Sequence, residues 1–241
     1  MQLERILQSQ GFGSRKACRA LIRAGAVRIA GETCTDPFAE FAEHDLGFSV
    51  HDHPWRYRAT VHLMLNKPEG YECSRAPKHH PGILGLLPEP LVLRGVQPVG
   101  RLDADTTGLL LLSDDGPFIH RLTSPRHAIG KVYEVGTKHP IDDAQIIALR
   151  AGVTLRDDPA PVAALACVRL GENRLRLTLG EGKYHQVKRM LAAVGNRVES
   201  LRRTAIGGLA LPGDLTPGAW RWLEAEDLQR LERPGPLEPL A

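Results

Sequence analysis

The chain has 241 residues, of which 42% are hydrophobic, and it carries 31 basic and 28 acidic side chains. This composition excludes wholesale disorder, because it supplies enough apolar surface for a buried core. No apolar run approaches the roughly 20 residues of a membrane-spanning helix, and the N-terminus does not look like a signal peptide. The four cysteines are scattered without a C-x-x-C pair, which argues against a zinc site and favours the reducing cytoplasm.

The charge is unevenly distributed along the chain. Residues 1–35 hold six basic and two acidic side chains, and residues 129–200 hold eleven basic and eight acidic ones. Two basic segments indicate an acidic partner, and nucleic acid is the first candidate. A solvated charged surface would give the same pattern, so the charge alone leaves both interpretations open.

The N-terminal segment predicts a small unit of two helices and a strand. Apolar residues near the start follow helical spacing, and Gly11 ends that helix. Ser14 is a good N-cap for a second helix, which ends at Gly25. A short strand at 27–29 follows, and the segment 51–60 is typical of a linker. Basic side chains lie on or beside the outer face of the second helix: Arg15, Lys16, Arg19 and Arg23.

The rest of the sequence predicts a larger domain that is rich in strands. Strands are expected at 61–65, 109–112, 132–137, 162–170, 174–179 and 198–206, and helices at 118–122, 143–150, 187–194 and 224–231. Strands outnumber helices without a β-α-β rhythm, which predicts an α+β fold with a mostly antiparallel sheet. The expected division is a first domain at 1–55, a linker at 56–60, a second domain at 61–231 and a flexible tail at 232–241.

The most informative segment is GRLDADTTGLLLLSDDG, residues 100–116, which places two aspartates in a turn before a buried strand. A poorly solvated carboxylate at such a turn is a candidate nucleophile or general base. Asp103 or Asp105 could equally cap the loop. The same residues fit the D-x-D-x-T pattern of magnesium-dependent phosphatases, but there the first aspartate follows an apolar strand. Here the apolar run comes after the motif, which argues against that interpretation.

The segment EGKYHQVKRM, residues 181–190, concentrates basic residues on a predicted helix. If this helix packs beneath the turn, Lys188 or Arg189 can pair with Asp103 and keep it ionised despite burial. The alternative is a basic helix face that contacts RNA phosphates. Tyr133, in a predicted strand, offers a flat surface on which a base can stack, although a tyrosine in a strand is more often part of the core.

Two other reactive side chains give weaker signals. His185 could take part in acid–base chemistry, and Cys73 could serve as a thiol nucleophile. No Cys–His–Asp set is visible in the sequence, so neither residue is expected to be catalytic.

In combination, these segments resemble the bacterial pseudouridine synthases that modify ribosomal RNA at single sites. The resemblance rests on LNKPEGYECS, GRLDADTTGLLLLSDDG, KVYEV and EGKYHQVKRM in this order. The N-terminal SRKACRALIRAGAVRIAG resembles an S4 RNA-binding module. Within the branch, HQVKRMLAAVGNRV and SPRH are most similar to the enzymes that act on small-subunit (16S) rRNA. One departure is Gly130, where close relatives tend to carry glutamate.

The resemblance implies a role for four residues. Asp103 matches the essential aspartate, Tyr133 the tyrosine that stacks on the target base, Lys188 the cation that pairs with the aspartate, and Arg101 an arginine that helps to handle the flipped nucleotide. The implied reaction is an isomerisation of uridine, which needs no metal or other cofactor. Asp103 would act as a nucleophile on the sugar or as a base at C2′, and the sequence leaves both routes open.

The implied partner is ribosomal RNA, either free or in an assembly intermediate, and the enzyme is expected to be a cytoplasmic monomer without membrane contact. The candidate RNA-binding residues are Arg15, Lys16, Arg19, Arg23, Arg28, Lys183 and Arg189. The alternatives are a large-subunit (23S) rRNA synthase of the same branch and a non-catalytic S4-type RNA-binding or ribosome-assembly protein. Intact Asp103, Tyr133 and Lys188 argue against a pure RNA binder.

Overall fold

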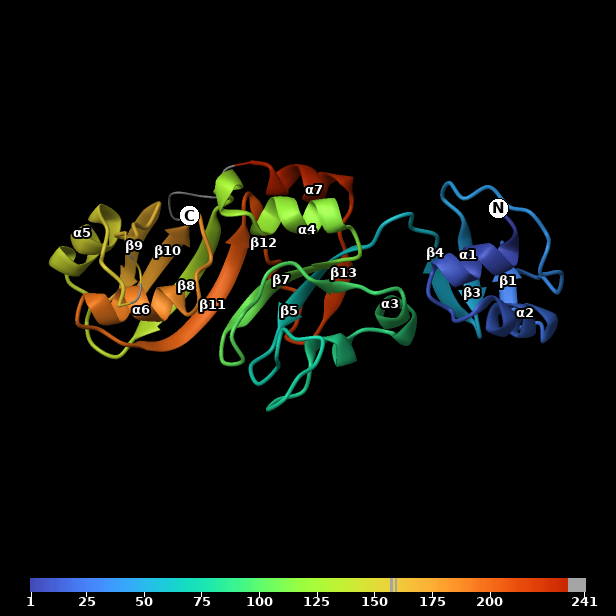
Figure 1. The fold of residues 1–241 in the computed structure, drawn as a ribbon, viewed down its shortest axis with the longest axis horizontal. Helices are drawn as coiled ribbons and strands as arrows, with labels where there is room; N and C mark the ends of the chain where they lie inside the picture. Colours follow the sequence, from blue (N-terminus) through green and yellow to red (C-terminus); the bar gives the residue numbers. More distant parts are fainter. Residues whose placement is uncertain (157, 159, 234–241) are drawn as a thin grey trace. The chain divides into compact units, whose positions relative to one another are not determined.

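A computed structural model describes residues 1–156, 158 and 160–233 (Figure 1). The chain divides into two compact units: Met1–Val61 together with Leu87–Gln97, and His62–Leu86 together with Pro98–Ala241. The sequence did not predict that residues 87–97 return to the first unit. The flexible tail expected at 232–241 falls, from residue 234 on, outside the described residues.

The first unit packs two helices on a small antiparallel sheet. The helices are α1 (Leu3–Ser9) and α2 (Arg15–Arg23), and the strands are β1 (Val27–Ile29), β2 (Glu32–Thr33), β3 (Gly47–Val50) and β4 (His53–Arg56), in the order β2-β1-β3-β4. Ser14 caps α2 as predicted, because its side chain accepts a hydrogen bond from the Ala17 amide. Cys18 and Ile22 on α2 are fully buried against Leu3 and Phe48.

Strand β4 lies in a segment that the sequence predicted as a linker. It forms a hairpin with β3, and the two residues between the strands, His51 and Asp52, have φ angles of 49° and 63°. Two left-handed residues form the tight turn that matches the strand twist, and such turns usually show an Asn-Gly or Asp-Gly signature. The pair His-Asp does not carry that signature, so the hairpin was missed. Pro54 is tolerated because β4 is an edge strand.

Residues 87–97 complete the first unit with the short helix α3 (Glu89–Leu93). Leu91 on this helix is fully buried. Arg94 donates hydrogen bonds to the Gln10 side chain at 3.0 Å and to the Arg58 carbonyl oxygen at 2.7 Å. These contacts tie a segment that is distant in sequence to the N-terminal helices and strands.

The second unit is built on one long sheet with the main path β13-β5-β7-β11-β8-β10-β9. Its strands are β5 (His62–Lys67), β7 (Thr107–Ser113), β8 (Lys131–Thr137), β9 (Ala166–Gly171), β10 (Arg174–Leu179), β11 (Val198–Ile206), β12 (Leu209–Ala210) and β13 (Trp220–Trp222), and β6 (Gln97–Pro98) lies where the chain re-enters this unit. Its helices are η1 (Ile83–Leu86), α4 (Gly116–Thr123), η2 (Pro125–His127), α5 (Asp143–Ala151), α6 (Gln186–Ala193) and α7 (Ala225–Leu231). Along the main path, only the β7–β11 pairing is parallel, which confirms the α+β prediction with a mostly antiparallel sheet.

The two halves of this sheet join at the short contact between β7 and β11. Only two residue pairs are in register there, Thr107 with Arg202 and Gly108 with Arg203. Gly108 has a φ of +99°, and a Cβ on it would lie 2.2 Å from the Arg203 carbonyl oxygen. Glycine is therefore required for the strands to approach. The buried Arg203 guanidinium strengthens the joint by donating to the Leu109 carbonyl oxygen at 2.8 Å.

Apolar side chains between the sheet and its helices form the core around β7. Met64, Leu109 and Leu111 on the strands pack against Phe118 on α4 and Leu231 on α7. Among the described residues, no helix is long and apolar enough to cross a bilayer.

Candidate active site

The loop that carries the two predicted aspartates is held by a buried lysine. Lys67 at the end of β5 is 0% exposed, and its ammonium donates to the carbonyl oxygens of Pro68 (3.0 Å), Ala104 (3.0 Å) and Thr106 (2.9 Å). Burial lowers the pKa of Lys67, although nearby acidic groups oppose the shift. The three carbonyl contacts replace the lost water and fix the backbone on both sides of Asp105.

Asp103 lies between two basic side chains from the segment 181–190. One carboxylate oxygen is 3.4 Å from His185 Nε2, and the other is 3.4 Å from Lys188 Nζ. The Lys188 ammonium also donates to both carboxylate oxygens of Asp105, at 2.7 and 2.8 Å. The structure thus brings Asp103 and Lys188 together, and it adds Asp105 and His185 to the same cluster.

The cluster is less buried than the sequence led us to expect. The side chains of Asp103 and Lys188 are 27% and 28% exposed, and that of Asp105 is 60% exposed. The close opposite charges of Asp105 and Lys188 nevertheless favour the charged form of each other. Burial alone would raise the pKa of Asp105, but the hydrogen bond and charge of Lys188 bring it below its usual value. Burial would likewise lower the pKa of Lys188, and the two aspartates raise it instead.

A small cavity of about 70 Å³ opens beside Asp103. Tyr133 from β8 lines it and is only 7% exposed, so this tyrosine belongs both to the core and to the cavity wall. Leu179 and Leu201 add apolar walls, and Arg101 stands at the loop that precedes Asp103. A flat aromatic ring, aliphatic side chains and an adjacent carboxylate suit an uncharged ring that must lie close to a reactive aspartate.

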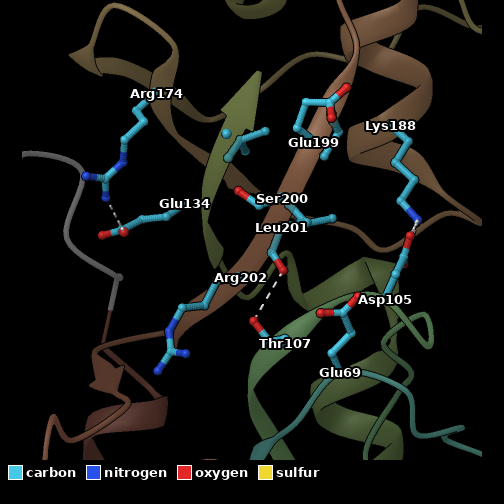
Figure 2. Close-up of a pocket in the computed structure, with 13 residues that line it drawn as sticks. Glu69, Asp105, Thr107, Glu134, Arg174, Lys188, Glu199, Ser200, Leu201 and Arg202 are labelled. Atoms are coloured by element: carbon cyan, nitrogen blue, oxygen red, sulfur yellow. Dashed lines mark hydrogen bonds and ion pairs between the residues drawn. The ribbon is translucent and has the colours of Figure 1, made fainter. Parts of the chain in front are cut away.

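A second, larger cavity of about 560 Å³ lies next to the first. Figure 2 shows Asp105 and Lys188 at one end of it and Arg174, Glu134 and Arg202 at the other. Tyr133 and Glu134 are neighbours in β8 and point to opposite sides of the sheet, and accordingly they line different cavities. Lys188 and Leu201 line both cavities, so the larger cavity borders directly on the aspartate cluster.

The predicted RNA-binding side chains differ in how far they are free to bind a phosphate. In the first unit, Arg15, Lys16, Arg23 and Arg28 are exposed, although Arg15 donates to the Gln8 side chain at 3.0 Å and Arg28 lies 3.2 Å from the Asp52 carboxylate. Arg19 is different, because its guanidinium makes a two-point ion pair with the buried Glu4 and stacks over Phe38. The uniform basic face expected on α2 is therefore interrupted, and Arg19 has a structural partner.

Two further RNA-binding candidates flank the aspartate cluster in the second unit. Lys183 lies 2.7 Å from the Asp158 carboxylate, and Arg189 donates to the Tyr184 carbonyl oxygen at 3.4 Å. Cys73, which the sequence left as a weak thiol candidate, is buried, and burial raises the pKa of its thiol. A raised pKa opposes thiolate formation. Within the described residues, no group of three or more His, Cys, Asp or Glu side chains could hold a metal ion.

Sequence reasoning missed two residues that build the site. Lys67 was not predicted as part of the site, because lysine is rarely fully buried and its carbonyl partners at Ala104 and Thr106 lie far away in the sequence. His185 was not expected at the site because the sequence shows no Cys–His–Asp set. Its Nε2 nevertheless contacts the Asp103 carboxylate oxygen that does not face Lys188. Its contact depends on a left-handed backbone, with a φ of 47°, which the local sequence does not predict.

Comparisons with known proteins agree with this architecture. The RNA pseudouridylate synthase family model matches residues 61–193, and the S4 domain model matches residues 1–37. The chain is 39% identical to the ribosomal small subunit pseudouridine synthase A of Escherichia coli K12, over 95% of this chain and 98% of that protein. It is 38% identical to an uncharacterized RNA pseudouridine synthase of Bacillus subtilis, over 97% of this chain and 99% of that one.

A solved structure shares the fold over nearly the whole length. This crystal structure of a pseudouridylate synthase superimposes with a TM-score of 0.68 at 33% identity and covers 96% of this chain and 99% of its own. Both the sequence and the fold therefore lead to one assignment. The chain belongs to the RNA pseudouridylate synthase family and carries an N-terminal S4 domain.

Proposed function

We propose that this enzyme converts one specific uridine of small-subunit ribosomal RNA into pseudouridine, with Asp103 as the reactive group. The observation that carries the proposal is the position of Asp103, whose carboxylate contacts Lys188 and His185 and borders the cavity lined by Tyr133. The choice of small-subunit RNA is supported by the name of the Escherichia coli relative and by the segments HQVKRMLAAVGNRV and SPRH.

The reaction rearranges bonds within one nucleotide. The C1′–N1 glycosidic bond breaks, the uracil turns, C5 bonds to C1′, and the proton on C5 moves to a ring nitrogen, so no atom is gained or lost. Asp103 either attacks the sugar as a nucleophile or removes a proton from C2′. Lys188 lies 3.4 Å from the carboxylate, and the hydrogen bonds of Lys67 hold its loop in place.

Other residues prepare the nucleotide for this step. A base inside a helix is out of reach, so the target uridine must leave its stack to enter the cavity. Tyr133 then supplies a stacking surface, and Arg101 contacts the extruded nucleotide. All these residues belong to the second unit of a single chain, which supports a monomeric catalyst. The S4 domain adds RNA affinity through its exposed basic residues, in the cytoplasm where ribosomes assemble.

Pseudouridine mapping in both ribosomal RNAs tests the proposal, with and without the gene. Cells that lack the gene should lose one pseudouridine of small-subunit RNA, and the wild-type gene should restore it while the Asp103→Asn gene should not. Loss of a large-subunit site instead would assign the enzyme to the related 23S class. An unchanged map in both RNAs would reject catalysis and leave an RNA-binding or assembly role.

A further inference from the structure

The loop before α6 presents an aromatic pair beside the aspartate cluster. The rings of Tyr184 and His185 are stacked, with centroids 3.8 Å apart and planes inclined by 19°. Tyr184 is 69% exposed, whereas Tyr133 is buried. One face of the Tyr184 ring rests on the histidine, so this large flat side chain is held in place while most of its surface stays in solvent.

The backbone of this loop is shaped to bring the two rings together. Neighbouring side chains of an extended segment point to opposite sides. His185 instead has a φ of 47°, in the left-handed region that non-glycine residues rarely adopt. Strained backbone of this kind is retained where surrounding contacts require it, often at functional sites. Here it places the His185 ring against Tyr184 while Nε2 reaches Asp103.

Basic groups lie on both sides of the ring pair in sequence. Arg189 in the first turn of α6 approaches the Tyr184 carbonyl oxygen at 3.4 Å, and its side chain is partly exposed. Lys183 precedes the pair directly, but its ammonium is paired with Asp158 at 2.7 Å, which leaves Arg189 as the nearby cation. An exposed aromatic face beside a guanidinium group matches a nucleotide, whose base stacks and whose phosphate is anionic.

We propose that Tyr184, supported by His185, binds the base of a nucleotide next to the target uridine, and that Arg189 contacts its phosphate. This inference rests on the proposed function. The target base itself is placed in the cavity that Tyr133 lines. The exposed ring of Tyr184 reaches the aspartate cluster only through His185, so it is placed to bind a nucleotide next to the target. Because any base can stack, Tyr184 and His185 contribute affinity for an unpaired strand rather than sequence specificity.

The first experiment measures single-turnover rates against RNA concentration, with a transcript of the small-subunit region that carries the mapped uridine. Tyr184→Ala should raise the half-saturating RNA concentration roughly 5- to 150-fold, the range for one lost base stack, with the saturating rate almost unchanged. Tyr184→Phe keeps the aromatic face and should behave like wild type. Ile147→Ala removes another exposed apolar side chain, on α5, and should have no effect.

The second experiment identifies the stacked nucleotide with synthetic RNAs that carry one abasic position on either side of the target. At one of these positions, loss of the base should weaken RNA binding to the wild-type enzyme. The same loss should not weaken RNA binding to the Tyr184→Ala enzyme any further, since both changes remove the same contact. Additive losses at both positions would overturn the inference. So would a Tyr184→Ala enzyme whose saturating rate falls while binding is intact, because the ring would then act through His185 on Asp103. Inactivity of the wild-type protein would instead count against the proposed function.

Discussion

At the scale of single residues, the site is a small network of charges rather than one ion pair. Lys188 is shared between two aspartates, and its ammonium is closer to Asp105 (2.7 Å) than to Asp103 (3.4 Å). Asp105 makes the shorter contact with the lysine, whereas each oxygen of Asp103 has one longer contact, to Lys188 or to His185. The two aspartates therefore differ in their contacts and exposure, and mutations can test their proposed functions separately.

Asp103→Asn should abolish pseudouridine formation and leave RNA binding intact. Removal of a nucleophile commonly costs on the order of 10⁴-fold or more in kcat, and asparagine preserves the shape of the side chain. Asp105→Asn should cost far less, because Asp105 acts on Lys188 and not on the sugar. Single-turnover assays with saturating RNA give both rates. An active Asp103→Asn enzyme beside an inactive Asp105→Asn enzyme would reverse the assignment.

Tyr133→Phe tests the hydroxyl separately from the ring. The ring alone stacks on the base, so RNA affinity should stay near normal, while turnover should fall strongly if the hydroxyl relays a proton. Tyr133→Leu should also weaken binding, since a base–aromatic stack contributes about 1–3 kcal/mol. Equilibrium binding and single-turnover rates separate the two effects. A fully active Tyr133→Phe enzyme would exclude the relay and leave stacking as the role of the ring.

Lys188→Ala should lower stability and activity together, because it leaves two aspartates without their shared cation. The pair is about a quarter exposed, so the loss of stability should fall between those of surface and buried pairs, at roughly 1–3 kcal/mol. Lys188→Arg should keep some activity. In urea unfolding, adding Asp105→Asn should offset more of the Lys188→Ala loss than adding Asp103→Asn. Strictly additive losses for both pairs would show that Lys188 is not coupled to either carboxylate.

At the scale of the elements, the sequence was informative where a signal is local. The cap at Ser14, the apolar run of β7 and the helical spacing on α6 each predicted an element that the structure contains. Local patterns failed where a contact depends on distant residues. The carbonyl partners of Lys67 and the return of residues 87–97 to the first unit cannot be read from spacing.

The same distinction applies to the site. Asp103 stood out because a polar turn precedes an apolar run, but the choice of Lys188 over Arg189 as its partner required a resemblance to known enzymes. Strand β13 escaped prediction because only three residues, Trp220–Trp222, pair with β5, too few to show an alternating pattern. His185 escaped because its backbone is left-handed.

Gly108→Ala tests the joint between β7 and β11. The substitution combines an unfavourable φ with a clash against Arg203 backbone, so it should destabilise the protein by at least about 2 kcal/mol and lower activity by shifting the aspartate loop. Gly116→Ala is the matched control, because no atom lies within 4 Å of its added Cβ. Urea unfolding measures both variants. Equal, small losses of stability in the two variants would show that the β7–β11 pairing accommodates the added methyl group.

At the scale of the whole molecule, the exposed basic residues of the S4 domain and the aspartate cluster lie in different units. The exposed Arg15 and Arg23 belong to the S4 domain, whereas Asp103 belongs to the second unit. The expected linker at 56–60 is not a simple boundary between them, because residues 87–97 also belong to the first unit. A truncated chain that begins after residue 55 would remove Gln10, a hydrogen-bond partner of Arg94, and most of the unit to which residues 87–97 belong, so point mutations are the better test.

Replacing Arg15 and Arg23 with alanine should flatten the slope of log K against log salt by about 0.7–0.9 for each lost phosphate contact. The saturating single-turnover rate should change little, because the chemistry lies in the other unit. Arg19→Ala should affect stability more than the slope, since it strands Glu4. Binding measured at several salt concentrations gives the slopes. An unchanged slope with a reduced saturating rate would show that α2 positions the catalyst and does not bind phosphate.

The discontinuous first unit has a consequence for biosynthesis. The chain leaves the ribosome from its N-terminus, so residues 1–61 emerge well before α3, whose Leu91 is fully buried in the same unit. Until residues 87–97 have been made, the N-terminal helices and strands lack part of their packing, and Gln10 lacks the hydrogen bond that Arg94 donates. The S4 domain can therefore reach its final form only after synthesis of the catalytic unit has begun. This order couples the completion of the first unit to the synthesis of β5, the first strand of the catalytic sheet.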